Sequence, residues 1–319
     1  MNARISGIVA LAVFVMTGSV DAQTRNPHAR RNVAPAAPAV SDQALAIQVL
    51  LDRAHFSPGQ IDGTFGTNTL QAMQAFARAR GLPSSDDRAT LLEALGGTTI
   101  EPLTTYEITE KDAEGPFTEV IPKDLMEQSK LPVLNYTSIL EAIGEQFHAS
   151  PTLLKRLNPG IEFRAGAKVR VPNILPADQA QAGDATVTVS QSASSLTVTD
   201  ANGQILMYAP VTSGSEHDPL PLGRWAVTSV LQNPTFNYNP ELFWDANPAH
   251  TKAKMPAGPN GPVGVVWIGL DKEHYGIHGT PKPSLIGRTQ SHGCVRLTNW
   301  DAARLATLVK KGTPVLFEE

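Results

Sequence analysis

The chain has 319 residues, which is more than one domain of ordinary size and predicts several. Hydrophobic residues make up 41% and charged residues 18%, as in an ordinary globular protein rather than a disordered or membrane-embedded one. The net charge of −4 gives no reason to expect a nucleic-acid partner.

The first 22 residues predict an export signal. Arg4 supplies a positive start, residues 5–16 form an apolar run, and small residues at 20–22 suit cleavage. The run is shorter than the roughly 20 residues that span a bilayer, so a transmembrane anchor is the weaker alternative. No cysteine follows that would carry a lipid. We therefore expect a mature protein in the periplasm or cell envelope, without a transmembrane span.

Residues 23–40 are rich in Pro and Ala and predict a disordered linker. Residues 41–97 predict a small three-helix bundle. Its first helix has apolar residues at helical spacing, and its second is expected to begin at a Thr67 cap and to end at Gly81. The first set is Ala44, Ile47, Leu50 and Leu51, and the face of the second helix is Leu70, Met73 and Phe76.

The turn between these two helices reads Asp62-Gly63-Thr64-Phe65-Gly66, followed by Thr69. This run resembles the three-helix type of peptidoglycan-binding domain. Asp62 and Thr69 are polar residues of the kind that serve turns and caps. We expect them to support the fold rather than to touch glycan.

Residues 102–173 predict a βααβ unit. A strand at 105–108 precedes an acidic ordered loop that extends to residue 127, and two helices are expected after caps at Thr137 and Ser150. Leu157-Asn158-Pro159 ends the second helix, and a strand follows at 167–171. The arrangement resembles a LysM domain with a long insert before its first helix. Glycan binding and a spacer role remain alternatives for it.

After a linker at 174–184, the pattern changes to alternation with period two. Residues 185–319 predict a mostly-β domain with an Asn202-Gly203 hairpin turn and one helix after a capping box at Thr298. The expected strands lie near residues 187–189, 196–198, 205–207, 223–230, 265–270, 275–278 and 313–317.

Residues 275–297 hold the single cysteine, Cys294, in Ser291-His292-Gly293-Cys294, sixteen positions after His278. A thiol near a histidine is a candidate nucleophile, because the imidazole can take its proton and remain as imidazolium beside a thiolate. The amides of residues 292–294 are a candidate oxyanion hole. A buried structural cysteine and a zinc site that uses His274, His278, His292 and Cys294 are the alternatives. We expect His274 and His278 to share one strand, about 13 Å apart.

The segments His278-Gly279-Thr280 and Ser291-His292-Gly293-Cys294-Val295-Arg296-Leu297 together resemble the signature of the L,D-transpeptidase (YkuD-type) catalytic domain. The resemblance implies that Cys294 is the nucleophile and His278 the general base. It also implies acylation of the cysteine by carbapenems. The pocket residues that it implies are Ser291, His292, Gly293, Gly279, whose carbonyl would orient His278, and Arg296.

The predicted substrate contacts are Tyr275, Trp267 and Arg288. Residues 250–311 carry nine Lys or Arg and three acidic residues, which favours a substrate with carboxylates. Residues 234–264 form a long stretch rich in Pro, Gly, Asn and aromatic side chains. Such a stretch predicts a lid or binding loop, with an ordinary solvent loop as the alternative.

The predicted fold is multidomain α+β: a three-helix bundle, a LysM-like βααβ module and a mostly-β, sandwich-like catalytic domain. The resemblance implies a cysteine transpeptidase without a cofactor or metal that acts on peptidoglycan stem tetrapeptides through a thioester. The acyl acceptor would be a second stem peptide, an outer-membrane lipoprotein or water. The alternative functions are a noncatalytic wall-binding protein, a carboxypeptidase that uses the same cysteine, and a zinc protein.

Overall fold

The computed structural model describes residues 41–97, 99–175 and 183–319. The predicted export signal and the first linker lie outside the described residues, as does most of the second linker. Among the residues described, the helices are too short or too polar to cross a lipid bilayer. All the elements described below belong to one compact unit.

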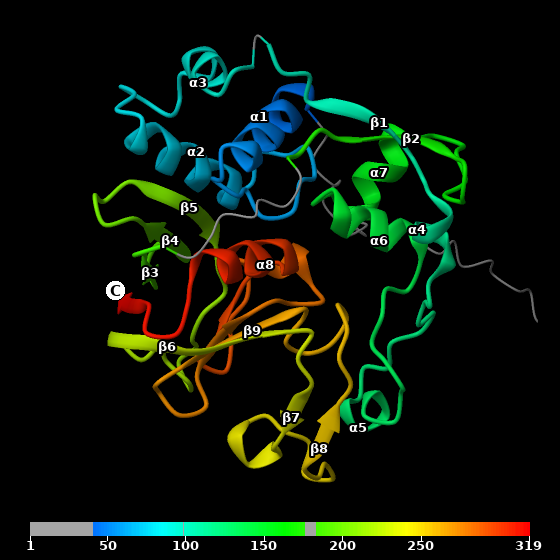
Figure 1. Cartoon of the computed structure of the whole chain (residues 1–319), viewed down its shortest axis with the longest axis vertical. Coiled ribbons are helices and arrows are strands. Elements are labelled where there is room, and N and C mark those ends of the chain that lie inside the picture. The colour runs from blue at the N-terminus through cyan, green and yellow to red at the C-terminus, as the bar shows by residue number, and fades with distance from the viewer. Residues whose placement is uncertain (1–40, 98, 176–182) are drawn as a thin grey trace, which may run out of the picture. The chain divides into compact units, whose positions relative to one another are not determined.

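Three helices open the described chain: α1 (Asp42–Arg53), α2 (Thr67–Ala79) and α3 (Arg88–Ala94) (Figure 1). The cap of α2 is Gly66 rather than the predicted Thr67, which already has the helical conformation. Met73 and Phe76 are buried as expected, but Leu70 is 40% exposed. The core of these helices also takes in Tyr208 from the sheet, so the helices are not packed as a self-sufficient bundle.

A buried glutamine ties the α1–α2 turn to both helices. The side-chain amide of Gln48 donates to Asp62 and to Thr69, at 3.0 Å each, and its oxygen accepts from the amide of Gly63 at 2.7 Å. Gln48 is 1% exposed, so these bonds satisfy groups that would otherwise be costly to bury. The contacts of Asp62 and Thr69 are therefore those of fold-supporting residues, as predicted.

The βααβ unit consists of antiparallel strands β1 (Leu103–Glu107) and β2 (Lys168–Pro172) with helices α6 (Ile139–Gln146) and α7 (Pro151–Leu157) between them. Ser150 caps α7 as predicted, but the cap of α6 is Ser138 rather than Thr137. The predicted acidic loop contains two short helices, α4 (Glu110–Glu114) and α5 (Leu125–Gln128). Caps at Thr109 and Asp124 explain both, because each side chain satisfies amides of the first helical turn.

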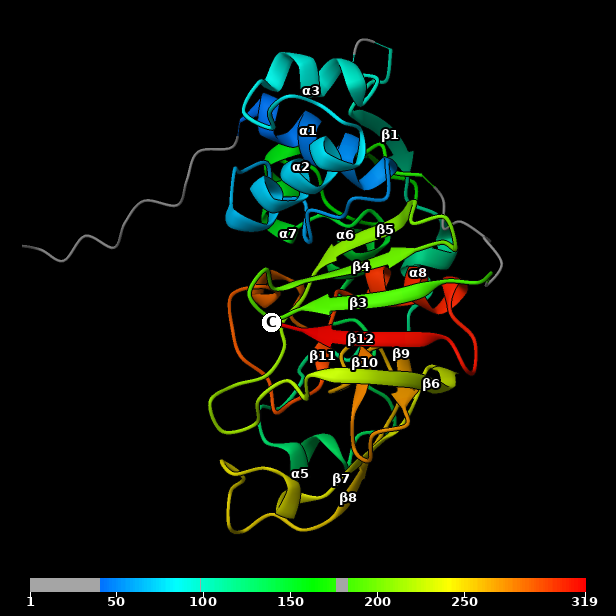
Figure 2. The ribbon, with the colours of Figure 1, turned by 90° about the vertical axis from the view of Figure 1, so that its left-hand side faces the viewer.

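Within the described residues, eight strands form one sheet in the order β11-β10-β9-β6-β12-β3-β4-β5. Figure 2 shows β5, β4, β3, β12 and β6 side by side. The strands are β3 (Thr186–Ser190), β4 (Ser195–Thr199), β5 (Ile205–Pro210), β6 (Gly223–Gln232), β9 (Val266–Leu270), β10 (Gly276–His278), β11 (Val295–Arg296) and β12 (Pro314–Glu318).

Strand β6 belongs to both halves of this sheet. Its residues 223–226 pair with β12 and its residues 227–232 pair with β9, with a register shift between Val227 and Ser229. A strand that changes partner in this way lets a single sheet curl, since a bulge bends the strand that carries it. The domain is therefore a curled mostly-β sheet, and the predicted sandwich is corrected to that extent.

Helix α8 (Asn299–Leu308) follows β11 directly and packs its apolar face into the core of the sheet. Thr298 caps α8, because its hydroxyl accepts from the amide of Asp301. The predicted capping box is incomplete: the Asp301 carboxylate accepts from the Thr298 hydroxyl at 2.6 Å instead of from the Thr298 backbone amide. The predicted loop at 234–264 contains a hairpin of β7 (Phe236–Tyr238) and β8 (Ala253–Met255) with a short 3₁₀ turn, η1 (Pro240–Leu242). A second 3₁₀ turn, η2 (Pro283–Leu285), lies between β10 and β11.

Candidate active site

The pairing of β10 with β11 brings His278 and Cys294 together. These strands are parallel, with His278 opposite Arg296, and Cys294 directly precedes β11. Side chains alternate along a strand, so Cys294, Arg296 and His278 face the same side. With strands ~4.8 Å apart and a rise of ~3.3 Å per residue, the Cα atoms of Cys294 and His278 lie about 8 Å apart, within reach of each other's side chains.

The environment favours the neutral form of both groups. Burial, reinforced by the charge of Arg296, lowers the pKa of His278 to about 4. Burial also raises the pKa of the Cys294 thiol, against the opposing effects of the Gly276 amide and the Arg296 charge. Both shifts favour a neutral thiol and a neutral imidazole over a thiolate–imidazolium pair. The imidazole is free to accept a proton at neutral pH, which is what a general base must do.

The orientation of the imidazole is set on two sides. Its Nδ1–H donates to the carbonyl of Gly279 at 2.7 Å, which leaves Nε2 as the unprotonated atom. Trp267, opposite His278 on β9, stacks on the imidazole ring with centroids 5.5 Å apart. Gly279 thus makes the orienting contact that the sequence predicted. Trp267 packs against His278 and supports it, and its predicted role as a substrate contact stays a prediction.

The backbone around Cys294 is shaped by its neighbours. The thiol donates to the carbonyl of His274 at 3.6 Å, and the Ser291 hydroxyl donates to the carbonyl of Cys294 at 2.6 Å. Gly293 has φ of 95°, and a Cβ there would lie 2.7 Å from the Tyr275 ring. Only glycine suits this backbone without strain, so Gly293 lets Tyr275 lie directly beside the thiol-bearing turn.

The amides of residues 292–294 are available to a ligand. Within the described part of the chain, none of the three donates a hydrogen bond to a protein acceptor. The adjacent Ser291 and Arg296 amides, by contrast, bond to the carbonyls of Gly214 and Thr212. Unpaired amides next to a thiol are the arrangement that stabilises a developing oxyanion.

The hairpin at 234–264 covers this turn. Asp245 accepts a hydrogen bond from His292 at 2.7 Å. The ring of Phe243 packs edge-on against the His292 imidazole, with ring centroids 5.0 Å apart. Trp244 stacks on His217 from the loop after β5, with centroids 4.2 Å apart. These contacts place the tip of the hairpin beside the turn that carries Cys294, and its role as a lid stays a prediction.

The base of the hairpin is held by the insert of the βααβ unit. His250 donates to Asp124 at 3.0 Å. The Leu134 amide donates to the carbonyl of Ala257 at 3.0 Å, and the Asn260 amide donates back to the carbonyl of Leu134 at 2.9 Å. Segments more than 120 residues apart in the chain thus support one element of the site.

The comparisons with known proteins agree with this geometry. The family model of the L,D-transpeptidase (YkuD) catalytic domain matches residues 184–316. YqjB of Bacillus subtilis, assigned as an L,D-transpeptidase, is 30% identical over 43% of this chain and 73% of its own length. The chain belongs to the YkuD family of L,D-transpeptidases. It is an enzyme of that family, whose members act on peptidoglycan.

This L,D-transpeptidase is also similar to two further proteins. YkuD of Bacillus licheniformis, assigned likewise, is 29% identical over 55% of this chain and 91% of its own length. A solved L,D-transpeptidase from Mycobacterium smegmatis is 18% identical, with a TM-score of 0.36 over 48% of this chain and 64% of that chain.

In this L,D-transpeptidase, Arg288 and His274 do not lie as the sequence predicted. Arg288 lies against Gly66 and lines a small cavity with Asp62, so it is turned to the helical unit rather than to Cys294. His274 has φ of 65° and lies outside β10, so it does not share a strand with His278. The imidazole of His274 lies 3.5 Å from the Glu273 carboxylate. Among the described residues, no three His, Cys, Asp or Glu side chains are grouped to hold an ion.

Two residues were missed by the sequence analysis. Asp245 gave no signal, because its importance depends on the fold of the hairpin. Asn299 is 3% exposed at the start of α8, donates to the carbonyl of Pro259 at 3.1 Å and accepts from the amide of Val265 at 3.2 Å. A Cβ on Gly279 would lie 2.2 Å from the Asn299 side chain, so Asn299 packs against the carbonyl-bearing residue that orients His278.

Replacing Asp245 with Asn is expected to raise KM by about 1.5- to 5-fold with little change in kcat, because partly exposed pairs contribute about 0.2–1 kcal/mol. The mutation loosens the lid without touching the reacting groups. Steady-state kinetics on a tetrapeptide stem measures this. Glu241→Gln is the matched control, since Glu241 pairs with Lys252 within the same hairpin and does not contact His292. An equal rise in KM for the control would contradict a specific role of the Asp245–His292 contact.

Proposed function

We propose that the protein is an exported enzyme that cross-links peptidoglycan stem tetrapeptides through a thioester on Cys294. The observation that carries the proposal is the neutral His278 imidazole, oriented by Gly279, on the same face of the sheet as a thiol next to unpaired amides. A thiol as nucleophile, an imidazole that accepts its proton and amides that bind the oxyanion are the three parts that acyl transfer to sulfur needs.

In the first half-reaction, Nε2 of His278 takes the thiol proton while the sulfur of Cys294 attacks the carbonyl between the diaminopimelate L-centre and the terminal D-alanine. The oxygen becomes an oxyanion at the amides of residues 292–294. The C–N bond then breaks, D-alanine leaves with the proton from His278, and a thioester remains on Cys294.

In the second half-reaction, an amine from a neighbouring stem peptide attacks the thioester carbonyl. The amine loses a proton to His278, the C–S bond breaks, and the sulfur recovers that proton. The product is a 3–3 cross-link. Water in place of the amine gives a carboxypeptidase product, and a lipoprotein lysine gives a tethered outer membrane.

The remaining parts of the chain support a location at the cell wall. The first 22 residues have the pattern of an export signal, and the two units before the sheet resemble wall-binding modules. We propose a periplasmic enzyme that its N-terminal modules hold near its substrate.

The experiment offers the full chain a tetrapeptide muropeptide with three acceptors: a stem-peptide amine, a lysine peptide and water alone. Mass spectrometry follows D-alanine release, the acyl mass on intact protein and each product. We expect an acyl-enzyme and a cross-linked dimer with the stem-peptide amine. Absence of both, together with pelleting on purified sacculi, would support a noncatalytic wall-binding protein instead.

A further inference from the structure

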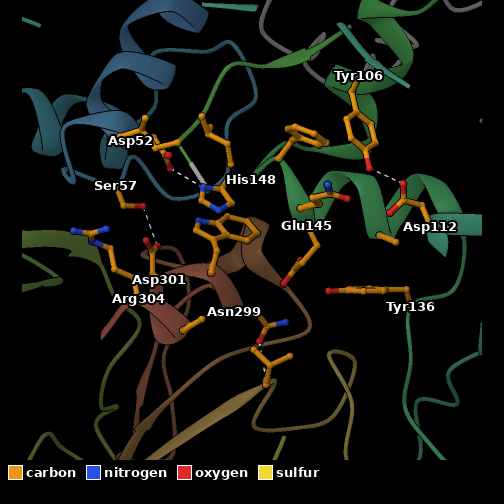
Figure 3. A pocket seen from close by; sticks show the side chains of 18 of the residues that line it. Asp52, Ser57, Tyr106, Asp112, Tyr136, Glu145, His148, Asn299, Asp301 and Arg304 are labelled. Carbon is orange, nitrogen blue, oxygen red and sulfur yellow. Dashed lines mark hydrogen bonds and ion pairs between the residues drawn. The ribbon is translucent and has the colours of Figure 1, made fainter. Parts of the chain in front are cut away.

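A cavity of about 1100 Å³ lies away from Cys294 and His278, neither of which lines it. Its walls come from the end of α1 and the turn after it, from α6 with the insert before it, and from α8 (Figure 3). The volume is at the upper end of the range for pockets that hold small organic ligands. It is therefore large enough for a ligand of two or three sugar rings.

Two polar atoms in this cavity are buried without a partner in the described structure: Oε1 of Glu145 and Nε1 of Trp300. Buried polar atoms in native proteins are nearly always satisfied, so each such atom calls for an explanation. One is an acceptor and the other a donor, so a single ligand that carries both kinds of group would satisfy them. Figure 3 shows the hydroxyl of Tyr136 directed toward the Glu145 carboxylate, which adds a third polar group at this point.

The other acids of the cavity are already engaged inside the protein. Asp52 accepts from His148 at 2.8 Å, Asp301 accepts from the Ser57 hydroxyl at 2.9 Å, and Asp112 accepts from the Tyr106 hydroxyl at 2.6 Å. Oε1 of Glu145 is thus the carboxylate oxygen left for a ligand. Burial raises the pKa of Glu145 to about 7, against the opposing effects of a hydrogen bond from the Asn299 side chain and the charge of His148.

The charge and the aromatic character of the cavity wall narrow the chemical class of the ligand further. The lining has four acidic side chains against one lysine and one arginine, which disfavours an anionic ligand. Aromatic rings form much of the wall, and their faces suit the C–H faces of sugar rings. Trp300 is held in place by His148, which stacks on it with centroids 4.9 Å apart. The aromatic residues are Tyr106, Phe117, Tyr136, Phe147, Tyr208 and Trp300.

We propose that this cavity binds a short uncharged saccharide bearing hydroxyl and amide groups, with a ligand N–H or O–H donated to Glu145 and a ligand oxygen accepting from Trp300. The site is separate from Cys294 and also from the exposed turn between α7 and β2. Binding of the saccharide in this cavity does not depend on the acyl-transfer activity. The role of the cavity is to hold glycan to the enzyme at a place lined by the first helical unit, the βααβ unit and the catalytic domain.

The test titrates the full chain with tri-N-acetylchitotriose by calorimetry and follows the indole N–H signals by NMR, with Trp300→Phe assigning the Trp300 signal. We expect saturable binding that shifts this signal. Glu145→Gln should weaken binding about ten-fold or more, since bonds to charged groups are worth about 1.5–3 kcal/mol. Glu162→Gln, an exposed site in the α7–β2 turn, is the matched control and should bind like the native protein.

Three results would overturn the proposal. The first is no binding at millimolar saccharide. The second is tighter binding of the deacetylated, cationic oligomer, which would show a site for amines. The third is loss of binding in Glu162→Gln with native binding in Glu145→Gln, which would place the saccharide on the other face of the βααβ unit. If Glu145→Gln does not fold, Trp300→Phe supplies the same comparison, because it removes the donor and keeps an aromatic ring.

Discussion

Replacing Cys294 with Ser is expected to lower kcat/KM by at least about 10³-fold and to remove the acyl-enzyme mass. A serine hydroxyl ionises far less readily than a thiol, and His278, whose pKa is lowered to about 4, is too weak a base to activate it. Release of D-alanine from a tetrapeptide stem measures the turnover, and intact-protein mass spectrometry measures the adduct.

The control for Cys294→Ser is Ser284→Ala, an exposed change in the loop that joins β10 to β11. It should retain native turnover and the native adduct. Turnover in Cys294→Ser within about ten-fold of the native enzyme would mean that the sulfur is not the nucleophile.

Replacing His278 with Gln is expected to lower kcat/KM by about 10²- to 10⁴-fold, the usual contribution of a general base. The native enzyme should show an acid limb in its pH–rate profile near pH 4, because the base works only when neutral and burial lowers its pKa to about 4. Activity is thus present above pH 4 and is lost as the pH falls through it. Kinetics between about pH 3.5 and 8 would show this limb in the native enzyme and its absence in the variant.

The lowered pKa of His278 also makes the free energy of unfolding depend on pH, so folding must be monitored in the same experiment. Between the ordinary histidine pKa of 6.5 and about 4, the unfolded chain binds a proton that native His278 does not, so this group destabilises the fold as the pH falls. Circular dichroism at each pH separates unfolding from protonation of the base. His217→Gln, an exposed histidine on the lid contact, is the control and should keep the acid limb. An acid limb near pH 6.5 in the native enzyme would contradict a buried neutral base.

The sequence predicted Cys294 and His278 as a pair, and the pairing of β10 with β11 brings the two residues near each other. Cys294 and His278 lie in short segments whose residue types are tied to chemistry, and the alternation around them predicted β10 with an error of one residue at its start. Seven of the eight strands of the described sheet and helix α8 were predicted for the same reason, since local periodicity reflects a buried face. Strand β11 was missed, because its two residues are too few to show an alternation.

The protonation states and the supports of the site were not predictable. The pKa of His278 depends on burial and on Arg296, which is brought to it only by strand pairing. The His292–Asp245 contact joins residues 47 positions apart, and nothing near Asp245 marks it. Helices α4 and α5 were missed because they are only five and four residues long, which is too short for a periodic pattern.

The insert between β1 and α6 has a practical consequence for recombinant work. The family match begins at residue 184, and an expression boundary chosen there would keep every catalytic side chain. It would also discard Asp124 and Leu134, the anchors of the hairpin that contacts His292. Such a fragment would lack the contacts that hold the base of this hairpin, so a turnover measured on it would not represent the full chain.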